Sequence, residues 1–273
     1  MNIRLVRSED IDIVSKIIVE GLDDRDSEIK EKVMEEIKLF NKVHFNYYYL
    51  AELENEVVGV LQVLDYEKIF HVSVLSILKT HQGKDIGSHL LKSILLNLKN
   101  IQLIQVYSND AAKEFYLKQG FRYVESACLY EINTINIHLD QQNHDIEVTT
   151  KLMKWMLDLD KLTTGYSKRP LFELLIELGA KIITYGKSGY VLLYNNTIGP
   201  VLAKNFEIAI NLIIKAIELG GKYITILEPQ LSHYKNSTKI TMRNLDIGHK
   251  MRFGDSLDKN LDLEFAIHSF GFS

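Results

Sequence analysis

The order in which strand and helix patterns recur constrains the fold of this chain most strongly. Residues 47–108 read as a strand hairpin, a third strand, a helix with an apolar stripe and a further strand. The same order returns in residues 180–228, where residues 209–230 run in step with residues 87–110. A repeated order of this kind indicates two copies of one α/β unit. The alternative is that two unrelated α/β units share the same coarse order.

A polar segment with weak patterning separates the two copies. We therefore predict an N-terminal domain at residues 1–132, a linker at 133–147 and a C-terminal domain at 148–273. Because 46% of the residues are hydrophobic, the chain can bury a core in each domain.

Charge and cysteine content narrow the classes of function. The net charge of −4 argues against a nucleic acid or an anionic membrane as a partner. Cys128 is the only cysteine, which excludes an intramolecular disulfide, and the nine histidines show no metal-ligand spacing, so no metal is expected. The charged N-terminus lacks the apolar run of a signal peptide, and no apolar run reaches the length of a membrane span. We expect a cytoplasmic protein.

The segment "QGKDIGS", residues 82–88, joins the third strand pattern to the apolar helix. A helix N-terminus exposes unpaired N–H groups and the positive end of the helix dipole, and glycines let the backbone approach a ligand. The combination predicts a pyrophosphate site. It lacks the Gly-Lys-Ser/Thr ending of a P-loop and does not match the dinucleotide fingerprint G-x-G-x-x-G.

Two motifs in this region resemble the GNAT N-acetyltransferase family. Gln82 and Gly87 match the two ends of its acyl-CoA pyrophosphate motif, Gln/Arg-x-x-Gly-x-Gly/Ala, and Asp85 replaces the middle glycine. Residues 107–121, "YSNDAAKEFYLKQGF", resemble the next motif of the family. The resemblance covers about residues 3–130 and implies the fold class α/β (α+β), with two tandem GNAT-like domains. Each would be a mixed, mainly antiparallel sheet flanked by helices.

The resemblance also implies an acetyl-CoA site and a general acid, Tyr116. The implied acetyl-CoA-binding residues are Ile77, Leu78, Lys79, Gln82, Gly83, Lys84, Asp85, Ile86, Gly87, Ser88, Asn109 and Ala112. Two of these roles have structural alternatives, because Asn109 could cap a helix and Tyr116 could be a core residue. The Asp85 carboxylate would oppose pyrophosphate binding by about 1–2 kcal/mol at an effective dielectric constant near 20. It therefore weakens acetyl-CoA binding or marks a domain that has lost catalysis.

The general base is not evident from the sequence. His71 has a suitable intrinsic pKa and shares a strand face with Ser73, so it is one candidate for this catalytic role. A base that acts through water is another, and a partly exposed histidine at a strand end is the structural alternative.

The second half resembles a divergent GNAT-like domain that follows an N-terminal GNAT domain. The sequence "AKNFEIA" stands where a glycine-rich loop would be, so we expect this half to bind the acceptor or to support the fold. Four clustered residues could bind the acceptor substrate: Asp160, Thr164, Tyr166 and Arg169. The alternative is a capped helix–turn–helix whose charges are solvated.

The resemblance implies an acetyl-CoA-dependent N-acetyltransferase that acts on a primary amine of a small metabolite by direct transfer. The partners would be acetyl-CoA and this amine, and the protein would be a monomer or homodimer. The alternative is a catalytically impaired acyl-CoA-binding or regulatory tandem GNAT protein. Asp85 and the missing base favour the alternative, whereas Asn109 and Tyr116 favour the enzyme.

Overall fold

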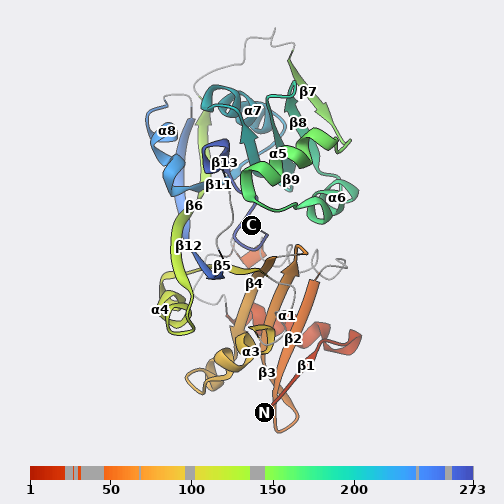
Figure 1. Cartoon of the computed structure of the whole chain (residues 1–273), viewed down its shortest axis with the longest axis vertical. Coiled ribbons are helices and arrows are strands. Elements are labelled where there is room, and N and C mark those ends of the chain that lie inside the picture. Colours follow the sequence, from red (N-terminus) through yellow and green to blue (C-terminus); the bar gives the residue numbers. More distant parts are fainter. Residues whose placement is uncertain are drawn as a thin grey trace. The chain divides into compact units, whose positions relative to one another are not determined.

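The chain forms two compact units, residues 1–106 and residues 107–273. The computed structural model describes residues 1–21, 27, 30–31, 46–67, 69–95, 102–135, 145–237, 240–255 and 260–272. Figure 1 labels the helices and strands of both units. Of the predicted linker, residues 136–144 lie outside the described residues.

The first unit is a sheet with the strand order β1-β2-β3-β4-β5. The pairs β1–β2, β2–β3 and β3–β4 are antiparallel, and the pair β4–β5 is parallel. The strands are β1 (Asn2–Leu5), β2 (Asn46–Leu53), β3 (Glu56–Asp65), β4 (Ile69–Ile77) and β5 (Leu103–Ser108). The helical elements are η1 (Ser8–Asp10), α1 (Ile11–Glu20), η2 (Lys79–His81) and α3 (Ile86–Leu95).

Helices cover both faces of this sheet. Strand β3 is buried at every position from Val58 to Leu64, although successive side chains of a strand point to opposite faces. Both α1 and α3 pack against β3, which accounts for this continuous burial. The apolar run in this strand therefore follows from a sheet that has no solvent-facing side here.

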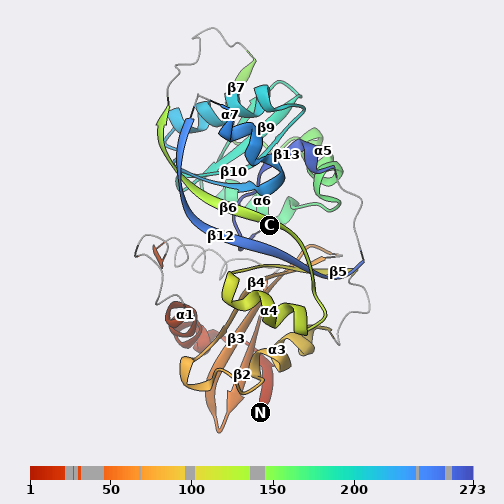
Figure 2. The ribbon, with the colours of Figure 1, turned by 90° about the vertical axis from the view of Figure 1, so that its left-hand side faces the viewer.

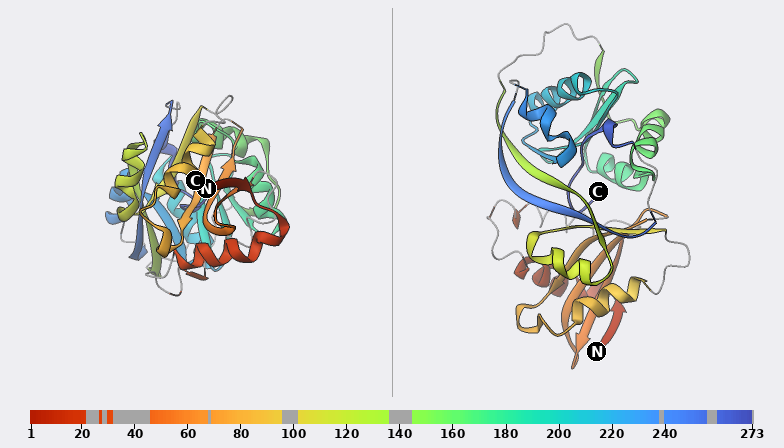
Figure 3. Two further views of the ribbon diagram at one scale, coloured as in Figure 1. Left: turned by 90° about the horizontal axis from the view of Figure 1, so that it is seen from below. Right: turned by 60° about the vertical axis from the view of Figure 1, so that its left-hand side comes forward.

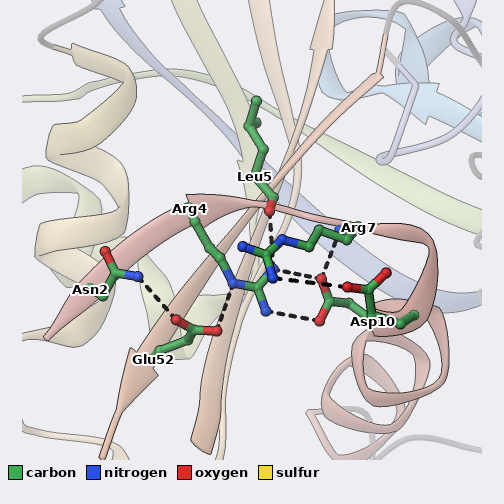
Figure 4. Close-up of polar contacts among 7 residues, drawn as sticks. Asn2, Arg4, Leu5, Arg7, Asp10 and Glu52 are labelled. Carbon is green, nitrogen blue, oxygen red and sulfur yellow. Dashed lines mark hydrogen bonds and ion pairs between the residues drawn. The ribbon is translucent and has the colours of Figure 1, made fainter. Parts of the chain in front are cut away.

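An ion-pair network fixes the N-terminal strand (Figure 4). The Arg4 guanidinium donates to Asp10 Oδ2 at 2.6 Å and Oδ1 at 2.9 Å, and Arg4 Nε donates to Glu52 Oε1 at 2.6 Å. The backbone N–H of Arg7 also donates to Asp10, at 2.7 Å. These bonds lower the pKa of Asp10 to about 2 and join β1, β2 and the start of α1.

The second unit contains a larger sheet with the strand order β12-β6-β11-β10-β9-β8-β7, and β13 pairs with β10. The strands are β6 (Arg122–Ile135), β7 (Ile146–Thr149), β8 (Lys181–Tyr185), β9 (Gly189–Tyr194), β10 (Thr197–Ala203), β11 (Tyr223–Leu227), β12 (Ile240–Gly254) and β13 (Glu264–Ala266). The helical elements are α4 (Asp110–Lys118), α5 (Lys154–Thr164), α6 (Arg169–Glu177), α7 (Phe206–Glu218), η3 (Glu228–Gln230), α8 (Leu231–Lys235) and η4 (Leu261–Leu263).

The apolar helix α7 forms the centre of the core of this unit. It packs against β8, β9 and β10, and Figure 2 shows it lying over β9 and β10. Its inward side chains, among them Ile210, Ile213 and Ile214, are at most 2% exposed. Burial of such a continuous apolar face is the main stabilising contribution to a helix–sheet layer.

The predicted repeat is present in the structure. In each copy an antiparallel hairpin leads to a third strand, a helix and a parallel strand: β4 pairs with β5, and β10 with β11. Two of the turns have two successive residues with positive φ: Glu54 and Asn55, at 50° and 68°, between β2 and β3, and Asn195 and Asn196, at 42° and 63°, between β9 and β10. This is the backbone of a two-residue turn between antiparallel strands.

The strand that ends the first predicted domain lies in the second unit. Strand β6 pairs antiparallel with β11 on one side and with β12 on the other, and Figure 3 shows β6 and β12 as adjacent long strands. The boundary between the two compact units falls within β5. The compact units and the sequence repeat therefore place the domain boundary at different residues. The domain boundaries 1–132 and 148–273 stay a prediction.

Candidate functional site

In the first unit, the segment after β4 reaches helix α3 through a tight, irregular turn. Leu78 donates its N–H to Val58 O at 3.0 Å, which extends the β3–β4 ladder by one residue. The 3₁₀ turn η2 follows, and the exposed residues 82–85 lead into α3. Gln82 Nε2 donates to Ile77 O at 3.0 Å, so this side chain closes the turn on the strand end.

Two residues of this turn have left-handed backbone conformations. Gly83 has φ 75° and Asp85 has φ 58°. Aspartate is one of the few non-glycine residues that adopt this region readily. Asp85 therefore has a backbone conformation that glycine adopts without steric cost, so replacing Asp85 by glycine would not strain this turn.

Asp85 also starts helix α3. Its carbonyl oxygen accepts the N–H of His89 at 3.1 Å and lies 2.8 Å from His89 Nδ1. The carboxylate itself lies at an exposed residue. The first N–H groups of α3, which begins at Ile86, have no acceptor within their own helix. Such a helix end is a common anion site, and the pyrophosphate site stays a prediction.

Helix α3 lies close to the sheet because β3 carries a glycine there. A Cβ atom added at Gly59 would lie 2.5 Å from Ile77 Cδ1, 3.2 Å from Leu90 Cδ1 and 3.3 Å from Ile86 Cγ2. Gly59 thus sets the position of the strand end and of the helix N-terminus at the same time.

His71 is fully buried and pairs with Gln105 across the parallel β4–β5 ladder. The alternative of a partly exposed histidine is therefore wrong, because strands and helices enclose this part of β4. The catalytic role of His71 as a general base stays a prediction.

In the second unit, the Asn109–Tyr116 motif forms the start and one face of helix α4. Asn109 is the N-cap, and its side chain accepts the N–H of Ala112 at 2.8 Å. Tyr116 lies one turn after Ala112, is 4% exposed, and packs edge-on against Phe115 and Phe121. Burial raises the pKa of its phenol, which keeps the group protonated at neutral pH. Asn109 therefore caps a helix and Tyr116 packs in the core, as their structural alternatives predicted.

The four predicted acceptor residues divide into three buried residues and one exposed residue. Asp160, Thr164 and Tyr166 are at most 7% exposed. Thr164 Oγ1 lies 2.9 Å from Asp160 O and 2.8 Å from Tyr166 O, which holds the turn between α5 and α6. Arg169 is instead exposed and pairs with Glu173 at 2.7 Å, one helical turn away.

Two of these residues, Thr164 and Tyr166, line a small pocket within the second unit. The other lining residues are Lys168, Lys250, Arg252, Glu264 and Ile267. None of the four charged members was predicted from the sequence. They come from three separate segments, and only the fold brings them together. The one local signal was that Lys250 and Arg252 alternate along a strand pattern.

The described part of the chain contains no group of three or more His, Cys, Asp or Glu residues arranged to hold a metal. No described helix has the length and hydropathy needed to cross a bilayer.

Comparison with known proteins decides the family of the first half. Residues 44–123 match the family described as "Acetyltransferase (GNAT) domain". This segment of the chain is similar to GNAT acetyltransferase domains. This match includes the turn before α3 and the Asn109–Tyr116 motif. No curated protein matches the chain by sequence.

Solved structures extend the GNAT likeness to the whole chain at the level of the fold. A Pyrococcus horikoshii protein assigned as an acetyltransferase has a TM-score of 0.88 at 19% identity, with 100% of this chain and 95% of that chain covered. A tandem GNAT protein from the clavulanic acid biosynthesis pathway has a TM-score of 0.61 at 8% identity, with 93% and 98% covered. A GCN5-related N-acetyltransferase from Sphaerobacter thermophilus has a TM-score of 0.58 at 14% identity, with 95% and 98% covered. The predicted tandem GNAT fold is confirmed.

Proposed function

We propose that the protein is an acetyl-CoA-dependent N-acetyltransferase whose acceptor is a primary amine of a small metabolite. The observation that carries this proposal is the turn at residues 82–85. It keeps the left-handed conformations at Gly83 and Asp85 and leads into the N-terminus of α3, inside the matched GNAT segment. Glycine-like backbone conformations before a helix N-terminus are what a pyrophosphate site requires.

The residues proposed to bind acetyl-CoA are named here within each unit. In the first unit they are Ile77, Leu78 and Lys79 at the strand end and residues 82–88 of the turn and helix start. In the second unit they are Asn109 and Ala112 of the α4 motif. Asn109 Oδ1 is engaged by the helix cap, so its side-chain NH₂ is the group left to donate to the pantetheine arm.

In the proposed reaction, the neutral amine of the acceptor attacks the thioester carbonyl carbon. The C–N bond forms, the C–S bond breaks, and the amine gives up one proton to water. Tyr116 donates its phenolic proton to the leaving thiolate. Burial raises the pKa of Tyr116, so the phenol is protonated at the working pH but is a weaker acid than an exposed tyrosine; the assignment therefore rests on the motif at residues 107–121.

Acetyl-CoA binding and turnover with a panel of small amines test the proposal. Tyr116→Phe keeps the ring that packs against Phe115 and Phe121 but removes the proton. We expect kcat to fall by roughly 10²-fold or more while the Kd for acetyl-CoA changes little. Tyr47→Phe, at an exposed tyrosine, is the matched control and should leave both constants unchanged. The absence of acetyl-CoA binding by the wild type, or an unchanged kcat in Tyr116→Phe, would contradict the proposal.

A further inference from the structure

A chain of four polar contacts joins two carboxylates within the second unit. His249 Nε2 lies 2.7 Å from Asp110 Oδ1, and His249 Nδ1 lies 3.0 Å from Ser126 Oγ. Ser126 Oγ lies 2.9 Å from the hydroxyl of Tyr123, which donates to Glu228 Oε2 at 3.3 Å. The five side chains come from α4, β12, β6 and η3, so the chain of contacts connects four elements of this unit.

Strand pairing brings the middle of this chain together. His249 and Ser126 are direct partners in the β12–β6 ladder, so their side chains lie on the same face of the sheet. The ladder then passes from Glu125 to Tyr123 and skips Val124. Such a bulge turns Tyr123 onto the face of Ser126, although residues three apart in a regular strand point to opposite faces. The contacts therefore follow from the register of two long strands.

The number of protons in the chain of contacts depends on the charge of His249. An ionised carboxylate only accepts hydrogen bonds, so each of the four contacts needs a proton from Tyr123, Ser126 or His249. The two hydroxyls supply one proton each, and a neutral imidazole supplies one more. Three protons cannot fill four contacts, whereas an imidazolium brings the total to four. All four contacts are hydrogen bonds at the same time only when His249 carries two ring protons.

The proton on His249 Nδ1 also sets the direction of the two hydroxyls. With Nδ1 as a donor, Ser126 accepts from His249 and donates to Tyr123, and Tyr123 donates to Glu228. With a neutral ring whose proton is on Nε2, both hydroxyls point toward His249 and Glu228 loses its bond. The two states thus differ in one ring proton, two hydroxyl orientations and one hydrogen bond.

Charges of both signs face the ring of His249. From α4, the Asp110 carboxylate attracts a positive ring at 2.7 Å, whereas Lys113 opposes it, with Nζ 4.6 Å from the centre of the Tyr123 ring. From η3, Glu228 adds a second negative charge at the far end of the chain. The His249 side chain is 9% exposed, so a charge there needs such partners to offset its desolvation.

The charged residues next to His249 and Ser126 along their strands lie on the alternate face. Lys250 follows His249, Glu125 precedes Ser126, and the two form their own ion pair at 3.5 Å. Because this pair is separate from the chain of contacts, it does not change the count of protons.

The start of helix α4 is attached to this chain. Asp110 is the first residue of α4 and directly follows its N-cap, Asn109. Ser108 Oγ also donates to His249 O, at 3.4 Å. A positive ring adds Coulomb attraction to its bond with Asp110, and loss of the proton removes this attraction. The proton on His249 therefore affects how firmly the first turn of the helix that bears Tyr116 is held.

We propose that His249 binds a second ring proton in the closed chain and, as an imidazolium, is a positioning residue that holds the start of α4. The proton-binding step depends only on the contacts within the second unit. The effect on Asn109 and Tyr116 rests on the proposed function, because it assigns the held helix to acetyl transfer.

NMR of the full chain with nitrogen-15-labelled histidine measures the proton. Two-bond proton–nitrogen spectra recorded across neutral pH show which ring nitrogens are protonated. The signals of His249 are those that are absent in His249→Gln or, if that variant does not fold, those that move in Asp110→Asn, whose carboxylate is 81% exposed. We expect both ring nitrogens to carry a proton at the acidic end and Nε2 alone to keep one at the alkaline end. A ring with one proton throughout would overturn the inference.

Tyr123→Phe tests the proton count without changing a charge. The remaining contacts need only the protons of Ser126 and a neutral ring, so we expect the proton-binding constant of His249 to fall roughly threefold or more, about the value of one hydrogen bond. Tyr47→Phe, at an exposed tyrosine of the first unit, is the control and should leave this constant unchanged. An unchanged constant in Tyr123→Phe would overturn the proton count.

A double variant tests whether Tyr123 and Glu228 act through the same proton. In Glu228→Gln the amide can donate to Tyr123, so a neutral ring again fills every contact, and the proton-binding constant of His249 should fall. Tyr123→Phe/Glu228→Gln should differ little from Glu228→Gln, because both changes remove the need for one proton. Fully additive losses would show that the two residues act on His249 independently and would contradict a single chain.

The pH profile of kcat tests the positioning of α4. Relative to the wild type, His249→Gln should have a kcat roughly threefold lower or less at the acidic end, and the ratio should approach one at the alkaline end, where the wild-type ring has lost its proton. If His249→Gln does not fold, Tyr123→Phe serves in the same comparison. A ratio that does not vary with pH would overturn the positioning role. Failure of acetyl-CoA to bind would overturn the proposed function, whereas the NMR titration would still report on the proton.

Discussion

At the scale of the residue, the backbone conformation of Asp85 and the charge of its side chain have separate effects on the proposed site. The position needs a left-handed backbone, and its φ of 58° supplies it. The exposed carboxylate adds only a screened charge near the proposed pyrophosphate site. The structure therefore favours weakened acetyl-CoA binding over loss of the site.

Substitution of Asp85 measures this charge. Asp85→Asn removes the charge but keeps a residue that tolerates positive φ, and Asp85→Gly removes the side chain. We expect both variants to bind acetyl-CoA about two- to fivefold more tightly, since a screened charge opposes binding by about 1 kcal/mol or less. Calorimetry measures the Kd. Weaker binding by Asp85→Asn would show that the carboxylate contributes a contact to the ligand.

Asp160 predicts a specific dependence of stability on pH. Burial, opposed by the nearby Lys168, raises the pKa of Asp160 to about 6. Because the folded-state pKa lies above the unfolded value near 3.8, the unfolded chain loses its proton first, and stability falls as pH rises from about 4 to 6. We expect Asp160→Asn to be more stable than the wild type by about 1–3 kcal/mol at pH 7 and by much less at pH 4.

Urea unfolding at pH 4, 5, 6 and 7 measures this difference. The control is Asp158→Asn on the same helix, where the carboxylate is 62% exposed and pairs with Lys154. That change should leave the pH dependence of the free energy of unfolding unaltered. An Asp160→Asn variant with the wild-type pH dependence would contradict the raised pKa.

At the scale of the element, the contact between β3 and α3 determines where the helix N-terminus lies. Gly59 permits this contact, because the space for a Cβ is taken by side chains of β4 and α3. A close helix–sheet approach is a common reason for a glycine within a strand. The position of the proposed acetyl-CoA site thus depends on packing beneath the turn.

Gly59→Ala tests this dependence. The added Cβ would lie 2.5 Å from Ile77 Cδ1, so we expect a loss of about 1–3 kcal/mol in the free energy of unfolding and weaker acetyl-CoA binding. Ile77→Val removes the clashing methyl group, and the double variant should recover part of both losses. Denaturant unfolding and calorimetry measure the two effects. Unchanged values in Gly59→Ala would show that α3 can shift freely.

At the scale of the whole molecule, the two copies of the GNAT-like unit differ at the place where the first has its turn. In the first copy, residues 78–85 lie between the end of β4 and the start of α3. In the second copy, β10 ends at Ala203 and α7 begins at Phe206, with Asn205 as its N-cap. The second copy therefore lacks the glycine-bearing turn of a pyrophosphate site.

This difference predicts one acetyl-CoA per chain. The Asn205 side chain already accepts the N–H of Ile208 at 3.0 Å, so the cap occupies part of the helix N-terminus. Calorimetric titration should give a stoichiometry of one, and Asn205→Ala should leave it unchanged. Two equivalents of acetyl-CoA bound per chain would show that the second copy also binds acetyl-CoA.

The oligomeric state, monomer or homodimer, and the cytoplasmic location stay predictions.

The sequence by itself determined the features that depend on local spacing. Apolar periodicity predicted the order of strands and helices in both copies. The motifs at residues 82–88 and 107–121 predicted the GNAT domain that the family match shows. These signals are local because backbone conformation and amphipathic spacing act over a few residues.

Only the tertiary structure decided which charges are buried together. Arg169 was predicted from the sequence as a binding residue, but its neighbour Lys168 is the one that lines the pocket. At the start of α6, adjacent side chains point in different directions, so Arg169 faces solvent and Lys168 faces the core. Lys250, Arg252 and Glu264 join it through strand pairings that bring distant segments together. Likewise, β6 pairs with strands of the second half because sheet register is set by long-range contacts, which no local pattern encodes.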